Sequence, residues 1–183
     1  MYSMVSAGTE LACLSGAESW FLLPGTPGYL SVGEVIEKGS EVDHLETGDV
    51  VYAFGPHASV FKIDTSCRWG GMNIKVPGGL RQDMAPFARM ASIAITGLRM
   101  SSIELGDYVA VAGLGTIGNF AAQQAQLQGA NVICFDVSDK RIELAKQCGL
   151  DNAFNSYGKD IVEEIKSRTG GRGVNTLIDA TGN

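Results

Sequence analysis

The sequence predicts an α/β protein in which a β-rich segment precedes a parallel sheet covered by helices. Residues 1–88 carry short apolar runs separated by Gly and Pro turn signals. Residues 89–183 alternate apolar runs with helical stretches, the pattern of parallel strands joined by crossover helices. A glycine-rich turn stands where the first of these later runs meets a helical stretch. We therefore expect two domains, 1–88 and 89–183.

The β-rich segment is expected to hold four strands. They cover residues 29–38, 49–54 and 58–63, and a short strand with its turn at 74–80. Gly33 inside the first strand indicates a bulge or a close backbone approach. Cys67, Arg68 and Trp69 fall in an irregular loop between the last two strands.

The second segment is expected to alternate regularly between helix and strand. The expected helices cover residues 86–99, 117–128, 140–148 and 160–168, and the expected strands cover residues 109–112, 131–136, 153–154 and 174–180. Strands in this order form a parallel sheet with helices on both faces. Residues 174–180 are expected to leave an exposed sheet edge, which can pair with another chain.

A dinucleotide-binding pattern joins the first two of these strands. Gly113, Gly115 and Gly118 have G-x-G-x-x-G spacing, and they stand between an apolar run and a helical stretch. The next apolar run ends in Asp136, 18 residues after Gly118, close to the usual spacing of about 20 for the ribose-binding acid. Glycines alone are a weak signal, whereas glycines between strand and helix with a terminal acid are a stronger one.

Each residue of this pattern has a physical role in holding a dinucleotide. Gly113 permits the tight turn, Gly115 lets a pyrophosphate approach the backbone, and Gly118 lets the helix pack close to the sheet. The helix N-terminus offers free N–H groups and the positive end of its dipole. The carboxylate of Asp136 can accept hydrogen bonds from the ribose hydroxyls of the adenosine. It would repel a 2′-phosphate, which favours NAD over NADP. The alternative is a plain strand–helix–strand turn whose glycines serve only packing.

Composition narrows the class of protein. The 183 residues are 45% hydrophobic and 19% charged, with a net charge of −6, which fits a globular protein and disfavours nucleic acid or an anionic membrane as partner. No apolar run has the roughly 18 residues that span a bilayer, and residues 1–6 lack the layout of a signal peptide. The four cysteines are scattered, so we expect reduced thiols in a cytoplasmic protein.

The order of motifs resembles the medium-chain dehydrogenase/reductase superfamily, the zinc-type alcohol dehydrogenases and their zinc-free relatives. The motifs that carry the resemblance are Ser6–Ala–Gly–Thr–Glu10, Pro27–Gly–Tyr29, Gly33 to Gly39, Gly48–Asp–Val–Val–Tyr52, Thr96–Gly97, Leu105 to Val109, Gly113 to Gly118, and Ile178 to Asn183. The resemblance implies a GroES-like catalytic domain followed by a Rossmann domain, with the active site of such enzymes in the cleft between the two. It also implies that both ends of the family's chain are missing here and that residues 1–183 alone are inactive.

The residues that stand at the positions of the family's zinc ligands cannot bind zinc. Where zinc-type members carry Cys before the Gly-Thr step, this sequence has Ala7, and where they carry Gly-His-Glu it has Gly28, Tyr29 and Leu30. Ser92 stands where another Cys is common, and the four-cysteine structural zinc lobe is absent from the sequence. Zinc needs Cys, His or carboxylate ligands, so we expect no metal.

The resemblance also assigns candidate site residues. Those for the cofactor are Thr96 near the nicotinamide, Gly113, Gly115, Thr116, Ile117 and Gly118 at the pyrophosphate, Asp136 at the ribose, Arg141 at the adenine, and Ala180 and Thr181 at the sheet edge. Thr9 and Tyr29 are the candidate catalytic proton donors. Alternatives remain for three side chains: Tyr29 as an aromatic that fills the vacated metal space, Arg141 as a solvated helix charge, and His57 as an incidental loop residue.

The sequence therefore predicts a zinc-independent, NAD(H)-dependent oxidoreductase that acts on a small alcohol or carbonyl, or on an activated alkene. A different class is kept open, a non-catalytic dinucleotide-binding or scaffold protein derived from a dehydrogenase. A small-molecule substrate and a homo-oligomer are expected, with no nucleic acid or membrane partner.

Overall fold

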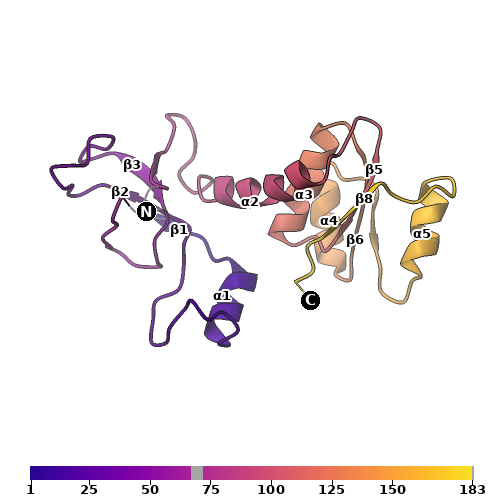
Figure 1. Cartoon of the computed structure of the whole chain (residues 1–183), viewed down its shortest axis with the longest axis horizontal. Helices are drawn as coiled ribbons and strands as arrows, with labels where there is room; N and C mark the ends of the chain where they lie inside the picture. Colours follow the sequence, from indigo (N-terminus) through magenta and orange to yellow (C-terminus); the bar gives the residue numbers. More distant parts are fainter. Residues whose placement is uncertain (67–71, 183) are drawn as a thin grey trace. The chain divides into compact units, whose positions relative to one another are not determined.

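The computed structural model describes residues 1–66 and 72–182 and divides the chain into two compact units, Met1–Arg89 and Met90–Asn183 (Figure 1). One unit holds a four-stranded antiparallel sheet and the other a four-stranded parallel sheet. The predicted α/β class is therefore confirmed. The predicted loop residues Cys67, Arg68 and Trp69 lie outside the described part of the chain.

The antiparallel sheet of the first unit has the strand order β1-β2-β3-β4. Its strands are β1 (Tyr2–Ser3), β2 (Ser31–Glu34), β3 (Val50–Ala53) and β4 (Ile74–Lys75). A small apolar cluster forms on β3, where Leu45, Val51 and Ala53 are buried and Phe61 packs against them. Leu30, Val32 and Tyr52 are buried as well, so the described core of this unit extends from β3 to β2 and the residue before it.

The predicted strand at 29–38 is longer than the observed β2. Ser31 to Glu34 are the residues in register with β3, which runs from Ala53 back to Val50. Beyond them, Val35 bonds to Gly48 and Asp49 just before β3. The expected bulge at Gly33 is wrong, since Gly33 stands opposite Val51 in an unbroken register. A Cβ added at Gly33 would lie 3.1 Å from the sulfur of Met1, so the close neighbour there is a side chain.

The predicted strand at 58–63 is wrong. That segment is irregular, although its apolar residues have a packing role. The ring of Phe61 lies directly against Gly55, where any Cβ would overlap it. Phe61 thus anchors a loop to the cluster on β3, and an apolar run of this length cannot by itself distinguish an anchored loop from a strand.

One helix in the first unit was not expected from the sequence. Helix α1 (Ala7–Leu14) follows the N-cap residue Ser6 and contains Gly8 in its first turn. Leu11 and Leu14 are exposed, so the helix lacks the continuous buried stripe that normally reveals an amphipathic helix.

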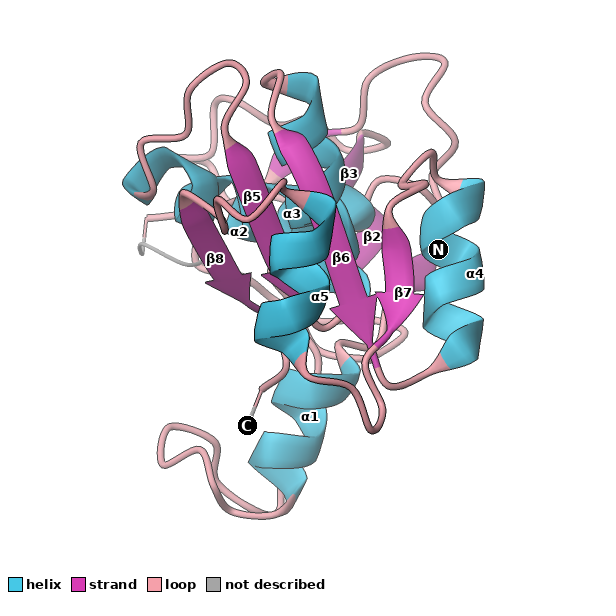
Figure 2. Cartoon of the chain, turned by 90° about the vertical axis from the view of Figure 1, so that its right-hand side faces the viewer, coloured by secondary structure: helices cyan, strands magenta, loops and turns pink. Residues whose placement is uncertain are grey.

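The parallel sheet of the second unit has the strand order β7-β6-β5-β8 (Figure 2). Its strands are β5 (Tyr108–Ala112), β6 (Asn131–Asp136), β7 (Ala153–Asn155) and β8 (Thr176–Asp179), and its helices are α3 (Thr116–Leu127), α4 (Asp139–Gln147) and α5 (Ile161–Arg168). Helix α2 (Phe87–Met100) leads into this unit. All these elements lie close to their predicted positions.

Helices cover both faces of the parallel sheet. Helices α3 and α4 lie on one face and α5 on the other (Figures 1 and 2). The α3 face is closed by small side chains, because Ala121, Ala122 and Ala125 are buried against Val109 and Val111 of β5. Alanine brings a helix close to a sheet while it retains the best helix propensity. The carboxyl ends of the strands are thereby held at one edge, with Ala112 beside Phe135 of β6 and Asp179 of β8.

Within residues 1–66 and 72–182, no helix is both long and apolar enough to cross a membrane.

Candidate functional site

The chain turns sharply at Gly113, where β5 ends. Gly113 has φ +83° and donates its N–H to the carbonyl of Phe135 at 2.9 Å. A Cβ built on it would lie 2.8 Å from the carbonyl oxygen of Ala180. Glycine is required here by both the backbone conformation and the close approach.

Gly115 is the N-cap residue of α3, and it faces open space. Its φ is −63° and its ψ is −176°, and a Cβ built on it would meet no atom within 4 Å. The first N–H groups of a helix lack partners inside the helix and carry the positive end of its dipole. In α3 these N–H groups belong to Thr116, Ile117 and Gly118, the first three residues of the helix. Helix ends of this kind can bind phosphate groups, and no atom within 4 Å occupies the Cβ position of Gly115 beside them.

Gly118 has a packing role that differs from that of Gly115. A Cβ on Gly118 would overlap the carbonyl oxygen of Gly113 and lie 3.1 Å from the Cβ of Ala180. Gly118 therefore lets the first turn of α3 rest on the end of β5 and on the residue that follows β8.

Asp136 ends β6 with its carboxylate turned onto the glycine-rich loop. Its side chain is only 3% exposed, and Oδ2 accepts the N–H of Leu114 at 2.7 Å while Oδ1 accepts the N–H of Ser138 at 2.9 Å. Arg141 Nη1 lies 3.3 Å from Oδ2. Burial alone would raise the pKa of Asp136, but the two backbone N–H groups and the Arg141 cation together hold that pKa below its usual value.

These bonds leave Asp136 ionised and partly free to accept another donor. A carboxylate offers about four acceptor positions, and three donors occupy Asp136 in the structure. Arg141 is 56% exposed, so its long side chain borders solvent while its guanidinium pairs with the acid. Arg141 is thus a largely exposed helix charge that also pairs with Asp136.

The remaining cofactor candidates are placed in different ways. Ala180 donates its N–H to Ala112 at 2.8 Å and lies against Gly113 and Gly118, and Thr181 bonds to Asp179 through its N–H at 2.9 Å and its hydroxyl at 2.8 Å. Both are therefore at the glycine edge of the sheet.

Thr96 is on α2, where its hydroxyl donates to the carbonyl of Ser92 in its own helix at 3.0 Å. The recorded contacts of Thr96 in the described residues do not join it to the glycine loop.

In the first unit, the structure joins the two candidate proton donors through a third hydroxyl. Tyr29 donates its phenol O–H to Ser6 Oγ at 2.9 Å, and Ser6 Oγ in turn donates to Thr9 Oγ1 at 3.3 Å. All three side chains are partly buried. Tyr29 is therefore more than an aromatic that fills space, because its hydroxyl belongs to a polar chain.

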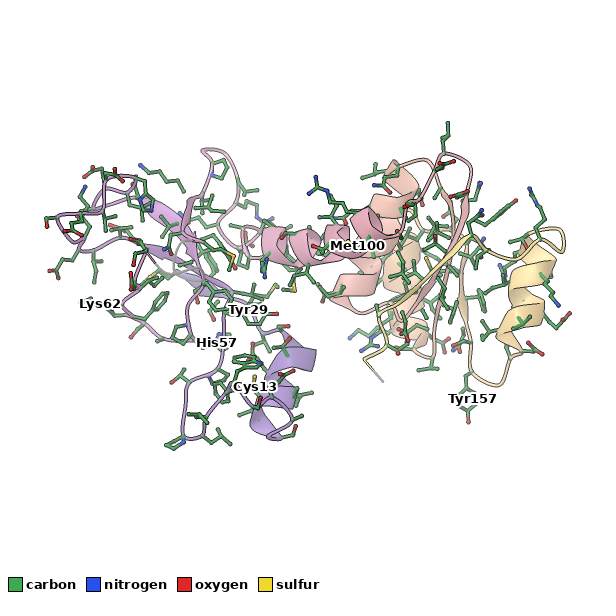
Figure 3. The ribbon with its side chains drawn as sticks, in the orientation of Figure 1. Cys13, Tyr29, His57, Lys62, Met100 and Tyr157 are labelled. Carbon is green, nitrogen blue, oxygen red and sulfur yellow. The ribbon has the colours of Figure 1, made fainter. Side chains whose placement is uncertain are left out.

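A carboxylate–imidazole pair adjoins this chain, and sequence reasoning missed it. Glu10, 7% exposed, accepts the N–H of Ser6 at 2.9 Å. His57 Nε2 lies 3.0 Å from both oxygens of Glu10, and its Nδ1 bonds to the hydroxyl of Ser3. Tyr29 and His57 both lie near α1 in Figure 3. Glu10 stands beside Thr9 in a recognised motif, which was the available signal, but its partner is 47 residues away.

The residues in this region do not form a metal site. Throughout the described ranges, no three His, Cys, Asp or Glu side chains lie together in a group that could hold a metal ion. Glu10 and His57 are two such groups, and the neighbours that contact them are serines.

Comparisons with known proteins agree with the fold. The family model described as zinc-binding dehydrogenase matches residues 116–183. D-guloside 3-dehydrogenase of Escherichia coli (strain K12) is 34% identical over 156 residues, which are 85% of this chain and 44% of that protein. An alcohol dehydrogenase of Geobacillus stearothermophilus is 30% identical over 176 residues, 81% of this chain and 52% of that protein. The chain spans about half the length of the curated relatives it matches.

Solved structures extend the likeness to both units. The alcohol dehydrogenase TADH from Thermus sp. ATN1 superposes with a TM-score of 0.77 at 24% identity, over 97% of this chain and 60% of that one. The Escherichia coli quinone oxidoreductase complexed with NADPH superposes with a TM-score of 0.78 at 23% identity, over 94% of this chain and 53% of that one. At these identities the likeness establishes the fold.

The solved dehydrogenase and reductase structures that superpose on this chain share its arrangement of an antiparallel unit followed by a parallel sheet. Within this class of dehydrogenases and reductases, the chain belongs to the medium-chain dehydrogenase/reductase superfamily, with a GroES-like first unit and a Rossmann-type second unit.

Proposed function

We propose that the protein is a zinc-independent, NAD(H)-dependent oxidoreductase for a small alcohol or carbonyl, or an activated alkene. The observation that carries the proposal is the glycine-rich loop: Gly115 borders open space at a helix N-terminus, and the buried carboxylate of Asp136 bonds to Leu114 of the same loop. Loop amides and an acid together can receive the diphosphate and the ribose of one dinucleotide.

A defined set of residues would hold this cofactor. They are Gly113, Gly115, Thr116, Ile117 and Gly118 at the diphosphate, Asp136 and Arg141 at the adenosine, Ala180 and Thr181 at the strand end, and Thr96 at the nicotinamide. When bound, the nicotinamide supplies or accepts the hydride, and the protein orients the groups and moves the proton.

The preference for NAD over NADP rests on Asp136. Its pKa lies below the usual value, so the side chain is anionic at neutral pH and would repel a 2′-phosphate. The quinone oxidoreductase from Escherichia coli is described as complexed with NADPH, so the fold by itself does not select NAD. The charge at the end of β6 therefore has to decide the choice in this chain.

Independence from zinc rests on the residue types at the family's ligand positions. Ala7 has no donor atom, and the Tyr29 hydroxyl already bonds to Ser6. A hydroxyl group can take over the task that zinc has in relatives, which is to polarise the substrate oxygen, by donating a hydrogen bond or a proton to it. Thr9 and Tyr29 are the proposed donors.

A second candidate is a dinucleotide-binding or scaffold protein without catalysis. The replacement of the zinc ligands also favours this candidate, since a dehydrogenase that loses its metal can keep the fold that binds the dinucleotide. This candidate leaves the hydroxyl chain and the Glu10–His57 pair without a catalytic purpose.

The two candidates are separated by turnover. The protein expressed from its complete gene is treated with a chelator, analysed for zinc, and assayed with NADH against aldehydes, ketones and quinones, and with NAD against alcohols. We expect turnover with less than about 0.1 zinc per chain, because Ala7, Tyr29 and Ser92 stand where relatives carry zinc ligands. Turnover that disappears with the metal and returns with added zinc contradicts zinc independence. NADH binding without turnover on any substrate favours the scaffold.

A further inference from the structure

The serine that begins α1 does not cap the helix with its side chain. Serine at an N-cap normally accepts a hydrogen bond from an amide two or three residues further on, but Ser6 makes no such bond. Its hydroxyl lies between the phenol of Tyr29 at 2.9 Å and the hydroxyl of Thr9 at 3.3 Å. A departure from a strong local preference is typical of functional positions.

Glu10 and His57 fix the position of this serine. Glu10 reaches back from the helix to accept the backbone N–H of Ser6 at 2.9 Å. His57 lies 3.0 Å from both carboxylate oxygens, so the buried acid keeps a partner. Gly28 allows His57 to lie this close, because a Cβ on Gly28 would be 2.8 Å from the backbone nitrogen of His57.

We propose that Ser6, Glu10 and His57 are positioning residues for proton transfer, a role that rests on the oxidoreductase function proposed above. Ser6 joins Tyr29 and Thr9 into one chain of hydroxyl groups. The Glu10–His57 pair holds the Ser6 backbone so that the chain stays intact. Tyr29, at a position where relatives place a zinc ligand, becomes the proton source.

The proton transfer balances in the direction of carbonyl reduction. The carbonyl carbon receives a hydride, and the carbonyl oxygen takes the proton of Thr9. Thr9 takes the proton of Ser6, and Ser6 takes the proton of Tyr29. The phenolate left on Tyr29 then regains a proton from water. A phenol is a much stronger acid than an aliphatic alcohol, so the net transfer is downhill. Alcohol oxidation runs the same transfers backward.

Matched variants test the chain. Ser6→Ala removes the bridging hydroxyl. Ser15→Ala is its control, because Ser15 is the C-cap residue at the other end of the same helix and its hydroxyl donates to the carbonyl of Ala12. His57→Gln removes the imidazole, and His44→Gln is its control, since His44 is exposed beside Asp43. Ser6→Thr keeps a hydroxyl and serves as the rescue variant.

We expect Ser6→Ala to lower kcat for carbonyl reduction roughly 100-fold, within the range of a lost general acid. The Kd for NADH should stay unchanged, and the solvent deuterium isotope effect on kcat should rise as proton transfer becomes rate-limiting. Ser6→Thr should recover part of the activity. His57→Gln should show the same pattern to a smaller extent, and both controls should match wild type.

A second measurement needs no cofactor. Amide hydrogen exchange at Ser6, followed by NMR in the unliganded protein, should become at least tenfold faster in Glu10→Gln and His57→Gln and stay unchanged in His44→Gln. A kcat of Ser6→Ala within twofold of wild type, or equal Ser6 exchange in His57→Gln and wild type, overturns the inference. A wild-type protein that neither binds NADH nor turns over any substrate overturns the oxidoreductase proposal itself. That failure differs from a failure of the present inference because it is seen in the wild-type protein, without any Ser6 variant.

Discussion

Two glycines of one motif have different physical roles, and the structure separates them. Gly118 has no room for a methyl group, because its Cβ would overlap the Gly113 carbonyl. Gly115 has φ −63°, which any residue can adopt, and nothing lies within 4 Å of its Cβ position. Gly118 is therefore required by the fold, whereas Gly115 is required only if a ligand approaches the loop.

This difference gives a prediction for two variants. Gly118→Ala should lower the free energy of unfolding by about 1–3 kcal/mol, the usual cost of overpacking. Gly115→Ala should leave that free energy within about 0.5 kcal/mol of wild type but weaken NADH binding, because the methyl occupies the space of the diphosphate. Denaturant unfolding and titration calorimetry measure the two effects. A Gly115→Ala protein with unchanged NADH affinity would show that the open space is not the diphosphate site.

Sequence reasoning reached the residues of local motifs and missed those that the fold assembles. Gly113 and Asp136 were predictable because the pattern around them is continuous along the chain. The bond between Glu10 and His57 joins residues 47 positions apart, and no local periodicity reports such a distance. The contact of Asp136 with Leu114 was equally hidden, because it depends on how β6 lies beside β5.

At the scale of elements, the second unit was predicted better than the first. Strand β5 is a buried run, and helix α3 has a buried alanine face made by Ala121, Ala122 and Ala125, so periodicity reports both directly. In the first unit, α1 exposes Leu11 and Leu14, and the apolar segment with Phe61 anchors a loop. Those elements are set by tertiary contacts that pattern reasoning does not contain.

Strand β8 leads to a prediction about self-association. In the described residues it pairs only with β5, so its other side presents unpaired backbone groups, and Leu177 on it is 59% exposed. An open edge with exposed apolar side chains favours pairing with another chain.

We expect residues 1–183 to associate as their concentration rises and Leu177→Lys to reduce that association, since edge lysines discourage pairing. Light scattering over a concentration series measures both, and Leu144→Lys on the exposed face of α4 is a matched control. A wild-type chain that stays monomeric at high concentration would contradict the prediction.

At the scale of the whole molecule, the fold class could be predicted because two different patterns follow each other in one chain. The order of short strands before alternating helices and strands fixes an antiparallel unit and a parallel one. Binding residues lie disproportionately on loops, which vary among relatives, so neither the motifs nor relatives at 30–34% identity determine the substrate of this chain.

The proposed function depends on the carboxylate of Asp136 deciding which dinucleotide binds. Titration calorimetry of NADH and NADPH with wild type and Asp136→Ala tests this most directly. Asp136 also accepts a hydrogen bond from Leu114, so the variant can loosen the loop and weaken the binding of both cofactors. The ratio of the NADH and NADPH affinities therefore isolates the effect of the charge. We predict that wild type binds NADH more tightly and that Asp136→Ala loses about 1–3 kcal/mol of this discrimination. Tighter binding of NADPH by wild type, or an unchanged ratio in the variant, would contradict the account.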